Sequence, residues 1–165
     1  MKYYELQYDR EKELLLFPVK EEKEGTGVVT GYVGRNFGPS APLRKYLYFG
    51  NRGLPPIIAS PEAKNNVGVF VEDMVSAIKV GRSYCALPVL SANIATEALK
   101  WASKTFNYVG VWLDRDMHGK SSRTAFKGSL LGGAKFFPVY TPGDPKEYSS
   151  IEQQQIIKEA LNFLV

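Results

Sequence analysis

Two stretches of similar pattern decide the fold: VGVFVED at residues 67–73 and VGVWLDRD at residues 109–116. Each is a short Val-rich run that contains a glycine and ends in carboxylates. Continuous apolar runs of this length are typical of strands buried on both faces of a parallel sheet, and ligands of such sheets bind beyond the carboxyl ends of the strands. The pattern therefore predicts that Glu72, Asp114 and Asp116 lie at one edge of a parallel sheet.

Several carboxylates at one sheet edge repel one another unless a hard cation such as Mg²⁺ neutralises them. Either motif alone is explained as well by a simpler cause, because strand ends meet water and helix N-termini favour negative charge. The two motifs occur in one alternating segment, and Gly119 and a predicted helix follow the second. Together they favour a divalent-metal site.

Composition limits the class of protein. The 165 residues suit one domain or one domain with a small appendage, and a net charge of +4 favours a polyanionic partner only modestly. Cys85 is the only cysteine, which excludes an internal disulfide and a cysteine-based zinc site. The charged segment Met1–Glu13 lacks the apolar run of a secretory signal, and no later stretch is long enough to cross a bilayer. We expect a soluble cytoplasmic protein without membrane contact.

The chain changes character near residue 60, after the Pro/Gly-bearing segment Gly50–Pro61. Residues 1–60 predict a small, mainly antiparallel β subdomain with strands at 14–19, 28–33 and 45–49.

Residues 61–165 alternate apolar runs with amphipathic segments, which predicts a Rossmann-like, mainly parallel four-stranded sheet flanked by helices. The expected strands are 67–71, 83–87, 108–113 and 134–140, and the expected helices are 74–81, 92–105 and 120–131, the last ended by Gly132-Gly133. A capping box at Ser149–Glu152 predicts a final helix. The fold class is α/β.

Three motifs of the second part resemble the Toprim family, the catalytic domain shared by bacterial-type primases, topoisomerases and some nucleases. They are Val69-Phe70-Val71-Glu72, the stretch from Trp112 to Gly119 with its Asp114-Arg115-Asp116, and Gly143-Asp144-Pro145. The resemblance implies a Toprim fold in which Glu72 is a catalytic acid or metal ligand and Asp114 and Asp116 hold Mg²⁺ or Mn²⁺. Asp144 would return to the same sheet edge as a further ligand, or serve only as a turn residue.

The first part resembles the N-terminal subdomain of the primase polymerase core. The matching pieces are Leu16-Phe17-Pro18-Val19, Val29 to Arg35, and Arg44-Lys45-Tyr46-Leu47. Topoisomerases and small Toprim nucleases are not expected to carry this segment. The resemblance covers about residues 14 to 148 and implies a primase of bacterial or phage type, acting in the cytoplasm of a bacterium or of a phage-infected host.

The chain also departs from the family pattern. Asp73 and Ser76 follow Glu72 where the family has glycine and, four residues after the glutamate, an aspartate. Asp73 would then shift the ligand set or cap the next helix. The late Asp-Pro-Asp of many primases reads Asp144-Pro145-Lys146. The zinc module and the helicase region of primases are absent from these residues, which implies that a helicase or zinc-binding module acts in trans.

Basic and aromatic residues provide candidate contacts to nucleic acid or nucleotide: Arg35, Arg44, Lys45, Tyr46, Arg115 and Lys120. Cations follow a single-stranded backbone while aromatic rings stack on bases. The alternative is that the tyrosines alternate with core residues and the cations solubilise a strand. Lys120, Arg123 and Lys127 recur at helical spacing. They form either a solvated helix face or a row of contacts to phosphates.

The sequence leaves three functions open. The leading one is a primase-type nucleotidyltransferase that binds single-stranded DNA template and nucleoside triphosphates and joins ribonucleotides. The second is a non-catalytic single-stranded nucleic-acid-binding protein on the same scaffold. The third is a Toprim metal-dependent nuclease, since the same ions can activate water for cleavage.

Overall fold

The computed structural model describes residues 6–23, 26–38, 46–50, 54–90 and 93–163. They form two compact units, one that ends at Pro56 and one that begins at Ile57. The sequence predicts the division at residue 60, within the same Pro/Gly-bearing segment.

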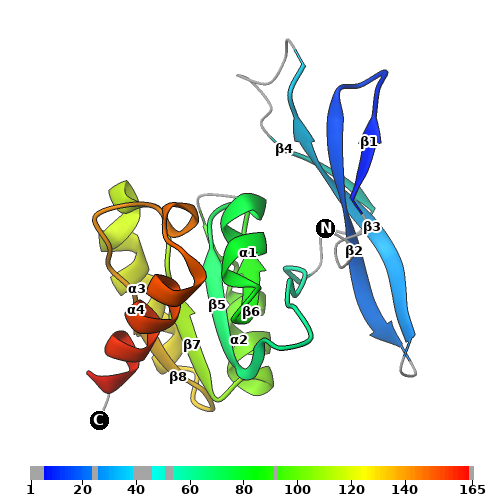
Figure 1. The fold of residues 1–165 in the computed structure, drawn as a ribbon. Coiled ribbons are helices and arrows are strands. Elements are labelled where there is room, and N and C mark those ends of the chain that lie inside the picture. The colour runs from blue at the N-terminus through cyan, green and yellow to red at the C-terminus, as the bar shows by residue number, and fades with distance from the viewer. Residues whose placement is uncertain (1–5, 24–25, 39–45, 51–53, 91–92, 164–165) are drawn as a thin grey trace. The chain divides into compact units, whose positions relative to one another are not determined.

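The first unit is a four-stranded antiparallel sheet in the order β1-β2-β3-β4. Its strands are β1 (Gln7–Asp9), β2 (Leu14–Lys23), β3 (Thr26–Asn36) and β4 (Tyr46–Gly50). Figure 1 shows the long hairpin of β2 and β3. The predicted antiparallel character is confirmed, while β1 was not foreseen because three residues carry no alternation to recognise.

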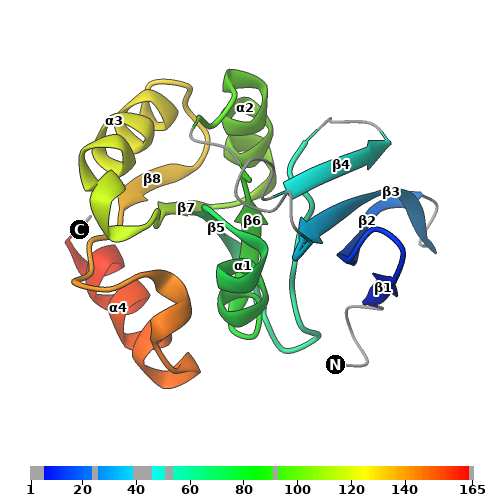
Figure 2. The same cartoon turned by 90° about the horizontal axis from the view of Figure 1, so that it is seen from above.

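The second unit is a parallel sheet in the order β6-β5-β7-β8, covered by helices on both faces. Its strands are β5 (Lys64–Val71), β6 (Tyr84–Pro88), β7 (Tyr108–Val111) and β8 (Lys135–Pro138). The helices are α1 (Met74–Val80), α2 (Thr96–Thr105), α3 (His118–Ser129) and α4 (Ser150–Asn162), with 3₁₀ turns η1 (Arg115–Met117) and η2 (Pro145–Glu147). In Figure 2, α2 and α3 cover one face and α1 and α4 the other. This confirms the predicted α/β fold class.

The two Val-rich runs lie side by side at the centre of this sheet, because β5 pairs with β7 in parallel register. Phe70 and Val111, a register pair, are both fully buried, as expected for strands covered on both faces. The acidic ends of the two runs therefore meet at one edge.

Several element ends differ from the prediction. β7 stops at Val111 rather than 113, although Trp112 and Leu113 stay buried. α2 begins only at Thr96, and α3 ends at Ser129, before the two glycines. Gly133 has φ +85°, and an added Cβ would collide with the carbonyl oxygen of Ser103, so the glycine serves the close approach of this turn to α2.

The predicted capping box of α4 is confirmed. Ser149 Oγ accepts a hydrogen bond from the Glu152 N–H, and the Glu152 carboxylate accepts one from the Ser149 N–H. Within the described residues, no helix has the length and apolar character needed to cross a membrane.

Candidate active site

Three carboxylates gather at the carboxyl edge of the parallel sheet. Asp73 follows β5, Asp114 follows β7, and Asp144 lies in the segment that follows β8. All three bring an oxygen near one ammonium, that of Lys146 in η2. Its Nζ lies 3.0 Å from Asp73 Oδ2, 3.0 Å from Asp144 Oδ2 and 3.6 Å from Asp114 Oδ2. We call these four side chains the acidic cluster.

Asp73 serves two purposes at once. It is the N-cap of α1, where its Oδ1 accepts a hydrogen bond of 2.8 Å from the Ser76 N–H, while its Oδ2 accepts one from Lys146. Its side chain is only 6% exposed. The prediction that Asp73 caps the next helix is confirmed, and its other oxygen joins the acidic cluster; a shift of the metal-ligand set stays a prediction.

The environment separates the carboxylates by their pKa values. Burial is the main cause that raises the pKa of Asp114 above its ordinary value; the charges of Asp144 and Asp73 add to this effect, while Lys146 opposes it. Burial also opposes the ionisation of Asp73, but the hydrogen bonds from Ser76 and Lys146 bring its pKa below the ordinary value. The pKa of Asp144 is likewise lowered, against burial, by Lys146 and the Arg115 N–H. The pKa of Lys146 is raised by its carboxylate partners despite burial.

The other two acids predicted for the site, Glu72 and Asp116, are not among the side chains of the acidic cluster. Glu72 is partly buried at the end of β5 and takes part in an interaction of its own. Asp116 is exposed on η1, outside the ion pairs of the acidic cluster.

Arg115, between the two aspartates, has an exposed side chain, and its backbone N–H donates to Asp144 Oδ1 at 3.2 Å. Lys120 is partly buried in the first turns of α3.

The predicted nucleic-acid contacts of the first unit are only partly described. Arg44 and Lys45 lie outside the described residues. The guanidinium of Arg35 on β3 lies 4.9 Å from the ring centroid of Tyr46 on β4, its register partner, and 5.9 Å from that of Phe37. Because the Phe37 side chain is 61% exposed, this cation–aromatic group reaches the surface.

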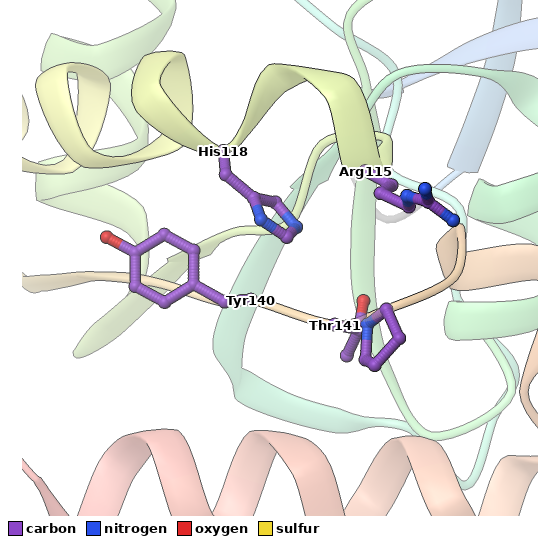
Figure 3. Close-up of a pocket in the computed structure, with 5 residues that line it drawn as sticks. Arg115, His118, Tyr140 and Thr141 are labelled. Carbon is purple, nitrogen blue, oxygen red and sulfur yellow. The ribbon is translucent and has the colours of Figure 1, made fainter.

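A pocket of about 550 Å³ lies beside the acidic cluster, lined by Arg115, His118, Tyr140, Thr141 and Pro142. Figure 3 shows His118 at the start of α3 and Tyr140 and Thr141 on the segment after β8. The His118 and Tyr140 rings meet edge to face with centroids 5.3 Å apart. His118 Nε2 is buried and has no hydrogen-bond partner among the described residues. The pocket thus combines a cation, aromatic surface and an unused ring nitrogen.

A short chain of hydrogen bonds fixes the loop that carries Asp144. The buried indole N–H of Trp112 donates to Thr141 Oγ1 at 2.8 Å, and the Thr141 hydroxyl donates to the Gly143 carbonyl at 2.7 Å. Trp112 lies two residues before Asp114, and Gly143 lies one residue before Asp144. The network therefore ties together the two segments that supply these carboxylates.

Replacing Thr141 by valine should lower the free energy of unfolding by about 1–3 kcal/mol, because the Trp112 N–H would stay buried without an acceptor. Urea denaturation measures the change. Thr141→Ser keeps the hydroxyl and serves as the matched control, with a smaller expected loss. Equal losses for the two variants would mean that the hydroxyl contributes nothing.

The acidic cluster fits a divalent cation in chemistry, since its oxygens are the ligands that Mg²⁺ and Mn²⁺ prefer. Asp114 Oδ1 is buried and has no hydrogen-bond partner among the described residues, so it is available to a cation. In the described part of the chain, however, no three His, Cys, Asp or Glu side chains are arranged to hold a metal ion. The observed carboxylates face Lys146 instead.

Lys146 is the residue that sequence reasoning missed. The sequence shows a lysine where a second acid is expected, and nothing in that substitution reveals that its ammonium contacts three carboxylates. His118 and Tyr140 also lack a motif, because the pocket they line forms only when α3 packs on β8.

The chain matches no protein-family model and no curated protein sequence. Its structure is similar to the crystal structure of the Aquifex aeolicus primase, zinc-binding and RNA polymerase domains, with a TM-score of 0.69 and 21% sequence identity. The match covers 89% of this chain and 40% of that chain. This likeness extends over both units and shows a primase-like core fold; this chain spans well under half of the solved structure.

Proposed function

We propose that this chain is a primase-type nucleotidyltransferase core with a Toprim centre, which binds single-stranded DNA and joins ribonucleotides with a divalent metal ion. One observation carries the proposal. In a chain with a primase-like fold, Asp73, Asp114 and Asp144 converge at the carboxyl edge of the parallel sheet, where ligands of such sheets bind.

Under this proposal Asp114 and Asp144 hold Mg²⁺ or Mn²⁺, with Glu72 and Asp116 as the further ligands implied by the family resemblance. The bound ion would neutralise charge on the phosphates of the incoming nucleotide, which is most of what such catalysis requires. Asp114 supports its role with an oxygen that no described hydrogen bond uses. Glu72 either completes the ligand set or accepts the proton of the attacking hydroxyl.

The pocket beside the acidic cluster is a suitable place for the nucleotide. Arg115 offers a cation for a phosphate, and the exposed ring of Tyr140 offers a surface for a base or sugar. His118 Nε2 would gain a hydrogen-bond partner from a ligand there. These groups lie on the segments that also carry Asp114 and Asp144.

The first unit is proposed to hold the single-stranded template. The Arg35 guanidinium stacks with Tyr46 near the exposed ring of Phe37, and this mixture of cation and aromatic surface suits a phosphate backbone with unstacked bases. A helicase or zinc-binding module in trans is part of the proposal, as the family resemblance implies.

The proposal is tested by incubating the purified chain with single-stranded DNA, labelled ribonucleotides, and Mg²⁺ or Mn²⁺. We expect short labelled RNA products that depend on template and metal and disappear with chelator. Absence of product for every template and metal, also with a zinc-binding module and helicase added, would contradict autonomous or assisted synthesis. Metal-dependent shortening of the DNA instead would support the nuclease alternative.

A second function is favoured by one specific feature, the lysine inside the acidic cluster. A centre already neutralised in part by Lys146 suits a non-catalytic protein that binds single strands through phosphate neutralisation. Such binding would weaken steeply with salt and would persist in chelator. Fluorescence anisotropy with labelled single-stranded DNA at several salt concentrations measures both properties, and loss of binding in chelator would rule this function out.

A further inference from the structure

Two polar side chains that line the pocket beside the acidic cluster already have hydrogen-bond partners. The Thr141 hydroxyl accepts one hydrogen bond and donates another. The Tyr140 hydroxyl is hydrogen-bonded to a serine of α3 at 2.7 Å. Pro142 has no polar side-chain atom. The two remaining side chains of the pocket, Arg115 and His118, make no hydrogen bond or ion pair to another described residue.

The imidazole of His118 is placed to bond a ligand in the pocket. Its ring meets the Tyr140 ring edge to face, and in Figure 3 it points from the start of α3 toward the segment that carries Tyr140 and Thr141. A polar ring without partners lacks the hydrogen bonds that water supplies in the unfolded chain, and a ligand group can replace them. His118 therefore favours a ligand with a hydrogen-bonding group.

Arg115 and Tyr140 indicate what else that ligand carries. The Arg115 side chain is exposed and has no carboxylate partner in the described part of the chain, so its guanidinium suits a phosphate. Tyr140 is 53% exposed and presents an aromatic ring to the pocket. A phosphate, a hydrogen-bonding group and a flat apolar surface are together the features of a nucleotide.

Two parts of a nucleotide can bond to His118, the edge of the base or the hydroxyls of the sugar. Template-directed joining must accept all four bases, whose edges differ in donors and acceptors, so a contact to the base edge would favour one base over the others. The sugar hydroxyls are the same in all four ribonucleotides. A hydroxyl both donates and accepts, so it suits the imidazole in either tautomer. The 2′-hydroxyl is the group that distinguishes RNA from DNA.

We propose that His118 binds the 2′-hydroxyl of the incoming nucleotide and so selects ribonucleotides over deoxyribonucleotides. The inference rests on the proposed function, because it takes the pocket as the nucleotide site. In this arrangement Arg115 holds a phosphate and Tyr140 lies against the sugar. The affinity that Arg115 provides is common to both kinds of nucleotide, whereas the affinity that His118 provides belongs to ribonucleotides alone.

The test compares the binding of ATP, 2′-deoxy-ATP and 3′-deoxy-ATP to the full chain, measured by isothermal titration calorimetry at one fixed Mg²⁺ concentration. Wild type should bind ATP and 3′-deoxy-ATP about 10-fold more tightly than 2′-deoxy-ATP, the effect of one hydrogen bond. His118→Phe keeps a ring beside Tyr140 without a ring nitrogen, so it should bind all three nucleotides equally. A preference for the 2′-hydroxyl that is absent from wild type, or retained by His118→Phe, would overturn the proposal.

Three further variants separate this contact from a general loss of binding. Arg115→Gln removes a charge that serves both kinds of nucleotide, so the two affinities should fall equally and their ratio should stay as in wild type. Tyr140→Phe removes a hydroxyl that is already hydrogen-bonded, and the same ratio is expected. His118→Gln retains a hydrogen-bonding group and should restore part of the preference. Loss of the ratio in Arg115→Gln or Tyr140→Phe would contradict its assignment to His118.

His118 also reports on its own contacts, because it is the only histidine of the chain. In protein without a histidine tag, its ring protons give magnetic resonance signals that need no further assignment. Saturating ATP should shift these signals more than saturating 2′-deoxy-ATP does, and equal shifts would contradict a contact to the 2′-hydroxyl. This measurement uses the wild-type protein, so it decides the matter also where His118→Phe does not fold.

The results distinguish the inference from the proposed function. Nucleotides that bind without regard to the 2′-hydroxyl would reject the inference and leave the proposed nucleotide site standing. If none of the three nucleotides bound, the nucleotide site of the proposed function and the inference would both be rejected.

Discussion

Asp114→Asn should reduce metal-dependent ribonucleotide joining by about 100-fold or more, while leaving the protein at least as stable as wild type. Activity should fall because the amide is a poor ligand for a hard cation and lacks the charge that balances it. Stability should hold because burial raises the pKa of Asp114, and a raised carboxyl pKa means that the ionised form is disfavoured in the folded state. The neutral amide removes that cost at neutral pH.

Two measurements on the same preparation check this prediction: product formation on a single-stranded template and urea denaturation in the absence of metal. Asp9→Asn is a suitable control, since Asp9 lies on β1 and its carboxylate accepts hydrogen bonds only from the nearby N–H groups of Glu11 and Lys12 among the contacts described. Activity retained by Asp114→Asn would remove Asp114 from the proposed catalytic centre. A large loss of stability would mean instead that the Asp114–Lys146 ion pair is needed for folding.

Phe70→Ala should lower the free energy of unfolding by about 3–5 kcal/mol, the cost of a large cavity in a core. Phe70 is fully buried on the central strand β5 and belongs to a core cluster shared with β6, β7 and helices α2 and α3. Total stabilities of domains are about 5–15 kcal/mol, so the variant would lose a large part of what holds the second unit together. Chemical denaturation followed by circular dichroism measures the loss.

Phe126→Ala is the matched control, because it removes the same atoms from a ring that is 65% exposed on α3. Its effect should stay within about 0.5 kcal/mol. Similar losses at both positions would contradict the assignment of Phe70 to the core.

The sequence was sufficient for the parts of the fold that are governed by local patterns. The Val-rich runs marked the central strands, and the capping box marked the start of α4, because burial on both faces and helix capping each leave a recognisable pattern. Element ends were less accurate, as at Trp112 and Leu113, which are buried outside regular strand structure. Hydrophobicity reports burial, and burial continues past the end of the assigned strand.

The candidate site was predictable in position and not in detail. The rule that ligands bind at the carboxyl ends of parallel strands correctly placed Asp114 and Asp144 at one edge. It could not show that Asp116 turns onto the exposed η1 or that Lys146 enters the cluster, because both depend on loop conformations set by contacts distant in sequence. Whether the cluster binds a metal ion stays a prediction.

The hydrogen bond between Trp112 and Thr141 gives this protein an optical sensor of the sheet edge that carries the acidic cluster. The chain has two tryptophans, and the indole of Trp112 is fully buried, 5.9 Å from the ring of Tyr148, with its N–H held by the loop that leads to Asp144. Indole emission depends on such surroundings. In a Trp101→Phe variant, the fluorescence of Trp112 alone can therefore follow rearrangement of the loop in real time, without any attached dye.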